Sequence, residues 1–369
     1  MIPLCVPEIK GNEWKYIKEC LDTNWVSSAG SYVDKFEKDF KKYLKIKKSI
    51  VTSNGTIALY LALKILEIGE GDEVIVPSFT FISPVNTIKY VGAEPVFVDV
   101  CKDTYVMDVE KVEELITSKT KAILPVHLYG HPVDMDRLIY IAEKHNLYII
   151  EDATESLGCL YKDRYVGTIG DIGCFSFNGN KLITTGAGGM LVTNNEKWGE
   201  NAKFLSTQAK VTNENKSFYH PEIGYNFRMP NILAAMGCAQ LESIDEYIKI
   251  KRENAAYYNE LLKDVKGIAL SIEKEWAKNV YWLYSIVVED EYGINRDQLI
   301  KILAENRIES RPFFIPVHEM PPYVDCKHGD LSVTEELSRK GINLPSSVGL
   351  TKEEIEKVCE VISSNGYLK

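Results

Sequence analysis

Between residues 48 and 194, short apolar runs rich in β-branched residues alternate with segments in which apolar residues recur at helical spacing. The apolar runs predict buried strands, and the segments between them predict helices. Because parallel strands need a crossover connection, this alternation predicts a mainly parallel sheet with helices on both faces. The expected strands are 49–53, 72–77, 94–100, 121–127, 147–152, 173–177 and 189–193, and the expected helices are 56–66, 83–91, 108–116 and 134–145.

The two flanks of this segment follow other patterns. Residues 10–44 predict two amphipathic helices around a loop, and residues 230–263 predict a long helical stretch. After residue 264, strand and helix patterns mix as in a small α+β unit. We therefore predict an α/β fold with a large domain of residues 1–250, which includes the N-terminal helical segment, and a smaller C-terminal α+β domain of residues 251–369.

The composition restricts the classes of partner. The chain has 369 residues and a formal net charge of −10, without a stripe of lysine and arginine, so we expect no nucleic acid partner. No run approaches the roughly 18 apolar residues of a membrane span, and the first residues lack a signal-peptide pattern. We therefore expect no membrane association and a cytoplasmic location. The eight cysteines form no C-x-x-C pair, which favours free thiols over disulfides or zinc.

Ligands of open α/β sheets bind at the carboxyl ends of the strands, so the residues that follow each strand matter most. Asp152 ends one strand, and a single aspartate in such a position is more often a helix N-cap than a functional carboxylate. Asn54, Gly55 and Thr56 link a strand to a helix, a turn that can seat a phosphate or simply cap the helix. Phe81 follows a third strand, where a core aromatic is the commoner explanation.

One lysine stands in the glycine-rich turn between two of the expected strands, in the stretch CFSFNGNKLITTGAGGMLV. A single lysine in such a loop is most often solvated. Lys181, however, follows Ser176 by five residues and Asp152 by 29, and the flanking strands would bury its stem. A lysine amine, a carboxylate and a phosphate seat are the groups that pyridoxal 5′-phosphate requires. Together they predict a site for this cofactor in the large domain.

Rival catalytic motifs are poorly matched. GAGG at 186–189 is not G-x-G-x-x-G and leads into a strand, which argues against a nicotinamide cofactor. G-x-x-x-x-G-K-[ST] and G-x-S-x-G are both missing from the sequence. His127, His131 and His145 lack the spacing of a zinc site, and we predict no metal.

Three longer stretches resemble one enzyme family: EDATESLG, GDIGCFSFNGNKLITTGAGGML and HPEIGYNFRMPNILAAMGCAQLE. They are similar to the motifs of the DegT/DnrJ/EryC1/StrS sugar aminotransferases, a branch of the fold type I pyridoxal phosphate enzymes. The similarity runs over nearly the whole chain. Within the family, the chain most resembles the branch that makes 4-amino-4,6-dideoxy sugars on nucleotide carriers, as in the bacillosamine and legionaminic acid routes.

The resemblance implies a role for each matching residue. Lys181 would carry the cofactor as a Schiff base and move a proton between cofactor and sugar. Asp152 would keep the pyridine nitrogen protonated, and Phe81 would stack on the ring. Asn226 would reach the phosphate from the other subunit of a homodimer. The implied cofactor-binding residues are Asn54, Gly55, Thr56, Phe81, Asp152, Glu155, Ser176, Lys181 and Asn226, and the implied catalytic residues are Lys181 and Asp152.

Glu155 departs from the commonest family pattern, in which Gln or His stands beside the cofactor's phenolic oxygen. An ionised carboxylate there would repel that oxygen. Our hypothesis is that Glu155 is protonated or donates through a water molecule.

The resemblance also implies the substrates. L-Glutamate would donate the amino group, and a UDP- or GDP-linked 4-keto-6-deoxyhexose, with an N-acetyl group, would accept it at C4 for surface glycan synthesis. Arginine suits the diphosphate because its planar fork bonds two oxygens. The candidate substrate-binding residues are Trp25, Ser27, Ser28, Gly30, Tyr219, His220, Arg228, Arg311 and His318.

Other functions stay open from the sequence alone. A 3-keto sugar aminotransferase of the same family, a pyridoxal phosphate lyase or aldolase, and a non-catalytic regulator that binds a nucleotide sugar would all keep this fold. Lys181 and Asp152 argue against the regulator, and the match around Asn226 argues against the lyase.

Overall fold

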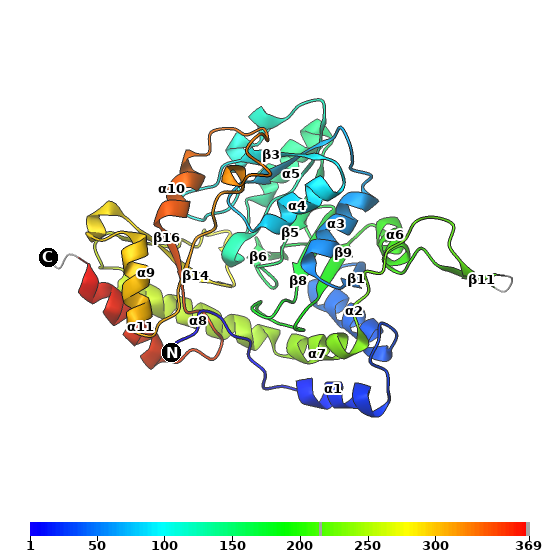
Figure 1. The fold of residues 1–369 in the computed structure, drawn as a ribbon, viewed down its shortest axis with the longest axis horizontal. Coiled ribbons are helices and arrows are strands. Elements are labelled where there is room, and N and C mark those ends of the chain that lie inside the picture. The colour runs from blue at the N-terminus through cyan, green and yellow to red at the C-terminus, as the bar shows by residue number, and fades with distance from the viewer. Residues whose placement is uncertain (214–215, 367–369) are drawn as a thin grey trace.

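The computed structural model describes residues 1–213 and 216–366 and contains the α/β fold predicted from the sequence. Its main sheet has seven strands, of which only β9 runs antiparallel to its neighbours. In spatial order they are β1 (Lys48–Thr52), β9 (Gly189–Thr193), β8 (Ile172–Ser176), β5 (Tyr148–Asp152), β4 (Thr120–Ile123), β2 (Glu73–Pro77) and β3 (Glu94–Val98). The parallel strands thus end at one edge of the sheet (Figure 1).

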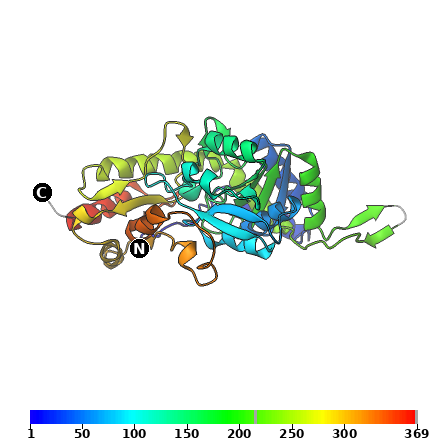
Figure 2. The same ribbon diagram turned by 90° about the horizontal axis from the view of Figure 1, so that it is seen from above.

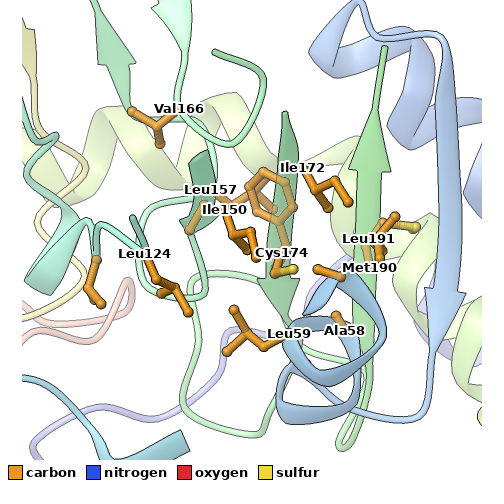
Figure 3. Packing of buried hydrophobic residues seen from close by; sticks show 14 of the residues in the cluster. Ala58, Leu59, Leu124, Ile150, Leu157, Val166, Ile172, Cys174, Met190 and Leu191 are labelled. Carbon is orange, nitrogen blue, oxygen red and sulfur yellow. The ribbon is translucent and has the colours of Figure 1, made fainter. Parts of the chain in front are cut away.

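Helices cover both faces of this sheet, because its central strands are apolar on both sides. On one face, α3 contacts β8, β9 and α6, and Figure 3 shows its Ala58 and Leu59 beside Cys174 and Met190. On the other face, Phe40 of α2 lies 5.2 Å from Phe175, ring centroid to ring centroid. The helices around the sheet are α1 (Glu13–Asp22), α2 (Ser31–Leu44), α3 (Gly55–Ile65), α4 (Ile82–Tyr90), α5 (Met135–His145), α6 (Glu196–Ser206) and α7 (Asn231–Glu242).

The helix expected over residues 108–116 is wrong. The chain forms two short 3₁₀ turns instead, η1 (Val109–Lys111) and η2 (Glu113–Leu115). Asp108 caps the first turn by accepting the Glu110 N–H at 3.1 Å. Nine residues offer little helix propagation to offset the cost of nucleation, so local capping decides the structure here.

A close backbone contact fixes β8 against the turn that precedes it. A Cβ atom at Gly173 would lie 1.9 Å from the carbonyl oxygen of Gly167. We expect Gly173→Ala to lower the free energy of unfolding by about 3 kcal/mol, because the backbone must move to admit the methyl group. Gly179→Ala is the control, since a Cβ there meets no atom within 4 Å. Urea denaturation of both variants tests this; equal midpoints would contradict it.

The C-terminal part has its own antiparallel sheet and its own apolar core. Its strands, in spatial order, are β12 (Ile268–Leu270), β14 (Tyr284–Val288), β16 (Gly341–Leu344) and β15 (Arg311–Pro312). Its helices are α8 (Ile244–Leu262), α9 (Arg296–Glu305), α10 (Ser332–Lys340) and α11 (Lys352–Asn365), with short 3₁₀ turns η4 (Asp290–Tyr292) and η5 (Val317–Glu319). The domain boundary predicted at residue 250 stays a prediction and falls inside α8, which contributes Tyr247 to the large core and Tyr258 to the small one. Ile2 also packs in the small core.

Two smaller sheets complete the described chain. One is β13 (Ala277–Lys278), β6 (Leu160–Tyr161) and β7 (Arg164–Tyr165). The other is the hairpin of β10 (Val211–Asn213) and β11 (Lys216–Tyr219), which projects away from the rest of the molecule in both Figure 1 and Figure 2. The hairpin lies between α6 and α7, where the sequence analysis predicted no strands. None of the helices in the described residues has the length and apolar character needed to cross a membrane.

Candidate active site

A cavity of about 310 Å³ opens at the edge of the main sheet where the parallel strands end. Its walls come from the start of α3, from the residues that follow β2, β4, β5 and β8, and from the C-terminal part. The lining residues are Asn54, Gly55, Thr56, Leu59, Thr80, Phe81, Ser83, Pro84, Val126, Asp152, Thr154, Glu155, Ser176, Asn178, Asn180, Lys181, Ala187, Gly188, Trp282, Arg311 and Phe314. Every predicted cofactor-binding residue except Asn226 is among them.

The N-terminus of α3 provides one wall. Asn54 caps this helix, its Oδ1 accepting the Ile57 N–H at 2.9 Å. The remaining N–H groups of the first turn have no partner within the helix, and the helix dipole adds partial positive charge. A Cβ at Gly55 would lie 2.9 Å from the Cβ of Ser176, so glycine is required for this close approach. The wall can therefore bind an anion such as a phosphate.

Asp152 lies at the carboxyl end of β5, where it is only 3% exposed. Its Oδ1 accepts the Thr154 N–H at 3.0 Å. Burial raises the pKa of Asp152, and the hydrogen bond to Thr154 and the nearby Lys181 oppose that rise in part. A cation in the cavity would favour the ionised carboxylate.

Behind Asp152, the buried carboxylate of Glu151 fixes the surrounding backbone. It accepts three backbone N–H groups, from Gly167 at 2.7 Å, Ile169 at 2.7 Å and Gly170 at 2.6 Å. His127 Nε2 lies 2.9 Å from Glu151 Oε2, while the Nδ1 of the same ring accepts the Val133 N–H at 3.1 Å. Because Nδ1 accepts this hydrogen bond, it carries no proton, and the ring donates from Nε2 to Glu151. The sequence analysis considered His127 only as a zinc ligand and missed this structural role.

Lys181 reaches the cavity from the turn between β8 and β9. Its backbone N–H donates to the Asn178 carbonyl at 3.0 Å, which closes the turn. Its Nζ lies 3.5 Å from Glu155 Oε1 and 3.9 Å from the centroid of the Trp282 ring. The side chain is 13% exposed, so the amine is largely shielded from water.

Glu155 is buried beside this amine, and its Oε2 accepts the Tyr129 N–H at 3.0 Å. Burial raises the pKa of Glu155, and Lys181 and the Tyr129 N–H counteract it. Asp152 adds to the rise, because two carboxylates in one site disfavour double ionisation. This direction agrees with the hypothesis that Glu155 acts in its protonated form.

Several lining residues were not found from the sequence, among them Thr80, Asn178, Asn180, Trp282 and Phe314. Thr80 follows a strand end, and the two asparagines directly precede or lie near Lys181 in the sequence. Their positions could therefore have indicated that they line the cavity. Trp282 is 101 positions beyond Lys181, and no local pattern links the two. Thr80 Oγ1 is buried and lacks a hydrogen-bond partner within the described chain, which leaves it available to a ligand.

The structure brings only one predicted substrate-binding residue, Arg311, to the cavity. Trp25 and Gly30 line a separate depression beside Asn231, whose Nδ2 donates to the Trp25 carbonyl at 2.7 Å. Ser27 and Ser28 belong to the same loop between α1 and α2, where the Ser27 carbonyl accepts the Asn231 N–H at 2.6 Å.

The remaining candidates lie outside the cavity lining. His318 contacts Ser78 Oγ through Nδ1 at 2.7 Å and Glu335 through Nε2 at 3.6 Å, so its ring is engaged within the fold. Tyr219 ends the projecting hairpin, and the neighbouring His220 lies 2.8 Å from the Gln208 carbonyl. Arg228 and Asn226 contact each other, Nε to Oδ1, at 3.3 Å. The resemblance implies that Asn226 acts in the other subunit of a homodimer, and this role, like those of Tyr219, His220 and Arg228, stays a prediction.

Comparison with known proteins decides the family. The sequence matches the DegT/DnrJ/EryC1/StrS aminotransferase family over residues 7–363. The chain belongs to this family. It is 45% identical to the GDP-perosamine synthase of Escherichia coli O157:H7, covering 98% of each chain, and 42% identical to that of Vibrio cholerae, covering 99% of each. It also superimposes on the pyridoxal phosphate form of a sugar aminotransferase, Spr1654 of Streptococcus pneumoniae, with a TM-score of 0.93, 27% identity and 98% coverage of each chain.

Membership confirms three predictions: the fold class, the cofactor and the enzyme class. The chain is a pyridoxal 5′-phosphate-dependent nucleotide-sugar aminotransferase. The finer assignment to the bacillosamine and legionaminic acid branch finds no support in these relatives, which are named for perosamine instead. This difference bears directly on the substrate.

Proposed function

We propose that this aminotransferase moves the amino group of L-glutamate to C4 of GDP-4-keto-6-deoxymannose, which gives GDP-perosamine. Transamination replaces C=O by CH–NH₂, so a 4-amino-4,6-dideoxy product requires a 4-keto-6-deoxy acceptor. The names of the relatives support the GDP carrier and the C4 position. The observation that carries the catalytic part is the meeting of Lys181, Asp152 and the N-terminus of α3 in one cavity.

The residues present fit the cofactor. The α3 N-terminus, with the hydroxyls of Thr56 and Ser176, suits its phosphate, and Asp152 suits its ring nitrogen. Thr80 also lines the cavity, and its buried Oγ1, which has no hydrogen-bond partner among the described residues, is a further polar group for a ligand. The Phe81 side chain is 54% exposed, and its ring centroid lies 6.0 Å from that of Phe314. Phe81 can therefore cover one face of the cofactor's pyridine ring. When bound, the cofactor supplies an electron sink for the carbon that gains or loses a proton.

The chain's own residues would then orient the cofactor and move protons. The Lys181 amine would hold the cofactor through its aldehyde and, when free, would accept a proton from one carbon and return it to the other. Asp152 would hold a proton on the ring nitrogen, because the buried carboxylate gains stability from an adjacent cation. Glu155 would donate a proton or hydrogen bond to the cofactor's phenolic oxygen. Arg311 lies at the mouth of the same cavity, where its fork can bind a carboxylate or a phosphate.

We propose further that two chains complete each site. Asn226, Tyr219 and His220 are not among the residues that line the cavity of their own chain, and the β10–β11 hairpin projects from the body (Figure 2). In a homodimer, the hairpin and Asn226 would contribute to the partner's cavity. Mixing Lys181→Ala chains with Asn226→Ala chains tests this, because only hybrid dimers would hold one intact site. Recovery of about a quarter of wild-type activity is expected; no recovery would contradict shared sites.

The substrate is tested with a panel of nucleotide sugars and glutamate. We expect the highest kcat/KM for GDP-4-keto-6-deoxymannose, with a lower value for a UDP-linked N-acetylated 4-keto-6-deoxy sugar and the lowest for a dTDP-linked 3-keto sugar. Product mass and NMR of the amino sugar identify the carbon that is aminated. A preference for the UDP-linked sugar would overturn the GDP assignment and restore the branch predicted from the sequence.

Glu155→Gln tests the protonation state of Glu155. We expect kcat within about tenfold of wild type, because a Gln amide also donates to an oxygen and can still accept the Tyr129 N–H. Glu155→Met should lose more activity, since it leaves the Tyr129 N–H unsatisfied and removes the donor. Cofactor content and kcat are measured for both variants. Loss of cofactor binding in Glu155→Gln would refute the hypothesis.

A further inference from the structure

The amine of Lys181 has an aromatic neighbour that neither the family motifs nor the cofactor chemistry explains. Its Nζ lies over the face of Trp282, 3.9 Å from the ring centroid. Trp282 is 3% exposed and comes from the segment that leads into β14, in the C-terminal part. The distance is short for a cation–π contact, which extends to about 6 Å. The contact places the amine over the ring face, where it is largely shielded from water.

Trp282 is itself fixed at both its side chain and its backbone. Its indole Nε1 donates to the Asn180 carbonyl at 2.6 Å, and Asn180 directly precedes Lys181. Its carbonyl oxygen accepts a hydrogen bond from Lys251 Nζ at 2.9 Å. Lys251 is 4% exposed and also donates to the Ser346 carbonyl. These bonds tie the ring to the turn that carries Lys181.

Lys251 has an unusual position for a lysine. Both of its hydrogen-bond partners are backbone carbonyls, and it forms no ion pair with a carboxylate in the described chain. Burial lowers the pKa of Lys251. A buried amine without a carboxylate costs free energy. From α8, the two hydrogen bonds of Lys251 link the segment of Trp282 to that of Ser346.

We propose that Trp282 is a positioning residue whose ring face holds the free ammonium group of Lys181 beside the cavity, and that Asn180 and Lys251 hold the ring in place. This inference rests on the proposed role of Lys181. A lysine that alternates between a bonded and a free state must stay within reach of the reacting carbon when it is free. The quadrupole of the indole attracts the ammonium form, and Glu155 alone would leave the long side chain less restricted.

The direct test weakens the ring quadrupole without changing its shape. Tryptophans with one, two and four fluorine atoms are incorporated site-specifically at position 282, and each protein is loaded with pyridoxamine 5′-phosphate so that the Lys181 amine is free. Reductive methylation of Lys181 is then followed by peptide mass spectrometry. We expect the rate of Lys181 methylation to rise with the number of fluorine atoms, to a total of about 5- to 30-fold, because the contact that holds the ammonium weakens. A flat series would overturn the proposal.

Substitutions separate the ring face from the indole hydrogen bond. Trp282→Phe keeps an aromatic face, so its methylation rate should lie between those of wild type and Trp282→Leu. Lys251→Met should raise the rate by less than Trp282→Leu. Methylation of Lys203, on α6, is the internal reference and should not change. A rate for Trp282→Phe equal to that for Trp282→Leu would overturn the role of the ring face.

Kinetics add a second readout that a purely structural role would not give. We expect Trp282→Leu to lower kcat while leaving KM for the nucleotide sugar within about twofold, because the ring contacts the amine. The methylation assay needs no turnover. If borohydride fails to fix the cofactor on Lys181, the proposed catalytic role fails, whereas the contact between Trp282 and the amine is still measured independently.

Discussion

Lys181→Ala is expected to lower kcat by about 10³-fold or more, because the amine both binds the cofactor and carries the proton between carbons. This corresponds to about 4 kcal/mol of transition-state stabilisation. The fold should survive, since the backbone N–H that closes the turn is kept and only the side chain in the cavity is lost. Single-turnover kinetics with glutamate measure the effect.

Three further measurements make this result specific. Borohydride reduction should attach the cofactor to the Lys181 peptide of the wild type and to no peptide of Lys181→Ala. Small primary amines in solution should restore part of the proton transfer. Lys203→Ala is the matched control and should keep wild-type activity. Lys203 Nζ lies 2.7 Å from Glu37 Oε1, and neither residue lines the cavity. Turnover of Lys181→Ala at the wild-type rate would refute the assignment.

The sequence was sufficient for the parts of this site that are local in the chain. Asn54 to Thr56, Asp152 and Lys181 each sit where an apolar run stops, and the parallel topology brings strand ends to one edge. The continuous apolar runs of the strands and the glycines of the Lys181 turn were readable signals. The helix expected at 108–116 failed because propensity over so short a stretch is weak against local capping.

The missed parts depend on contacts between distant segments. Trp282 meets Lys181 only because β14 packs against β16 and the Asn180 carbonyl accepts its indole N–H. His318 is typical of the opposite error: a polar residue near a motif appeared available for substrate, yet Ser78 and Glu335 already contact both its ring nitrogens. Periodicity and motifs carry no information on such tertiary partners.

The second large effect is expected at Asp152. Asp152→Asn should lower kcat by about 10²- to 10³-fold, or about 3–4 kcal/mol, because an amide cannot stabilise a proton on the ring nitrogen as a carboxylate does. The amide oxygen can still accept the Thr154 N–H, so the local backbone should be preserved. Asp171→Asn is the control: Asp171 lies just before β8, at the other edge of the sheet, and accepts the Ile149 N–H at 2.8 Å.

The pH dependence of cofactor retention distinguishes a charge effect from a packing effect at this position. Burial raises the pKa of Asp152, so its neutral form persists to a higher pH than for an exposed aspartate. The charge that holds the protonated ring is present above that pKa and is lost as the pH falls through it. Equilibrium dialysis of the enzyme without borohydride reduction should therefore show cofactor binding that weakens at low pH in the wild type. This loss of binding at low pH should be absent in Asp152→Asn. An identical pH profile in both proteins would assign Asp152 a packing role and remove it from the proton chemistry.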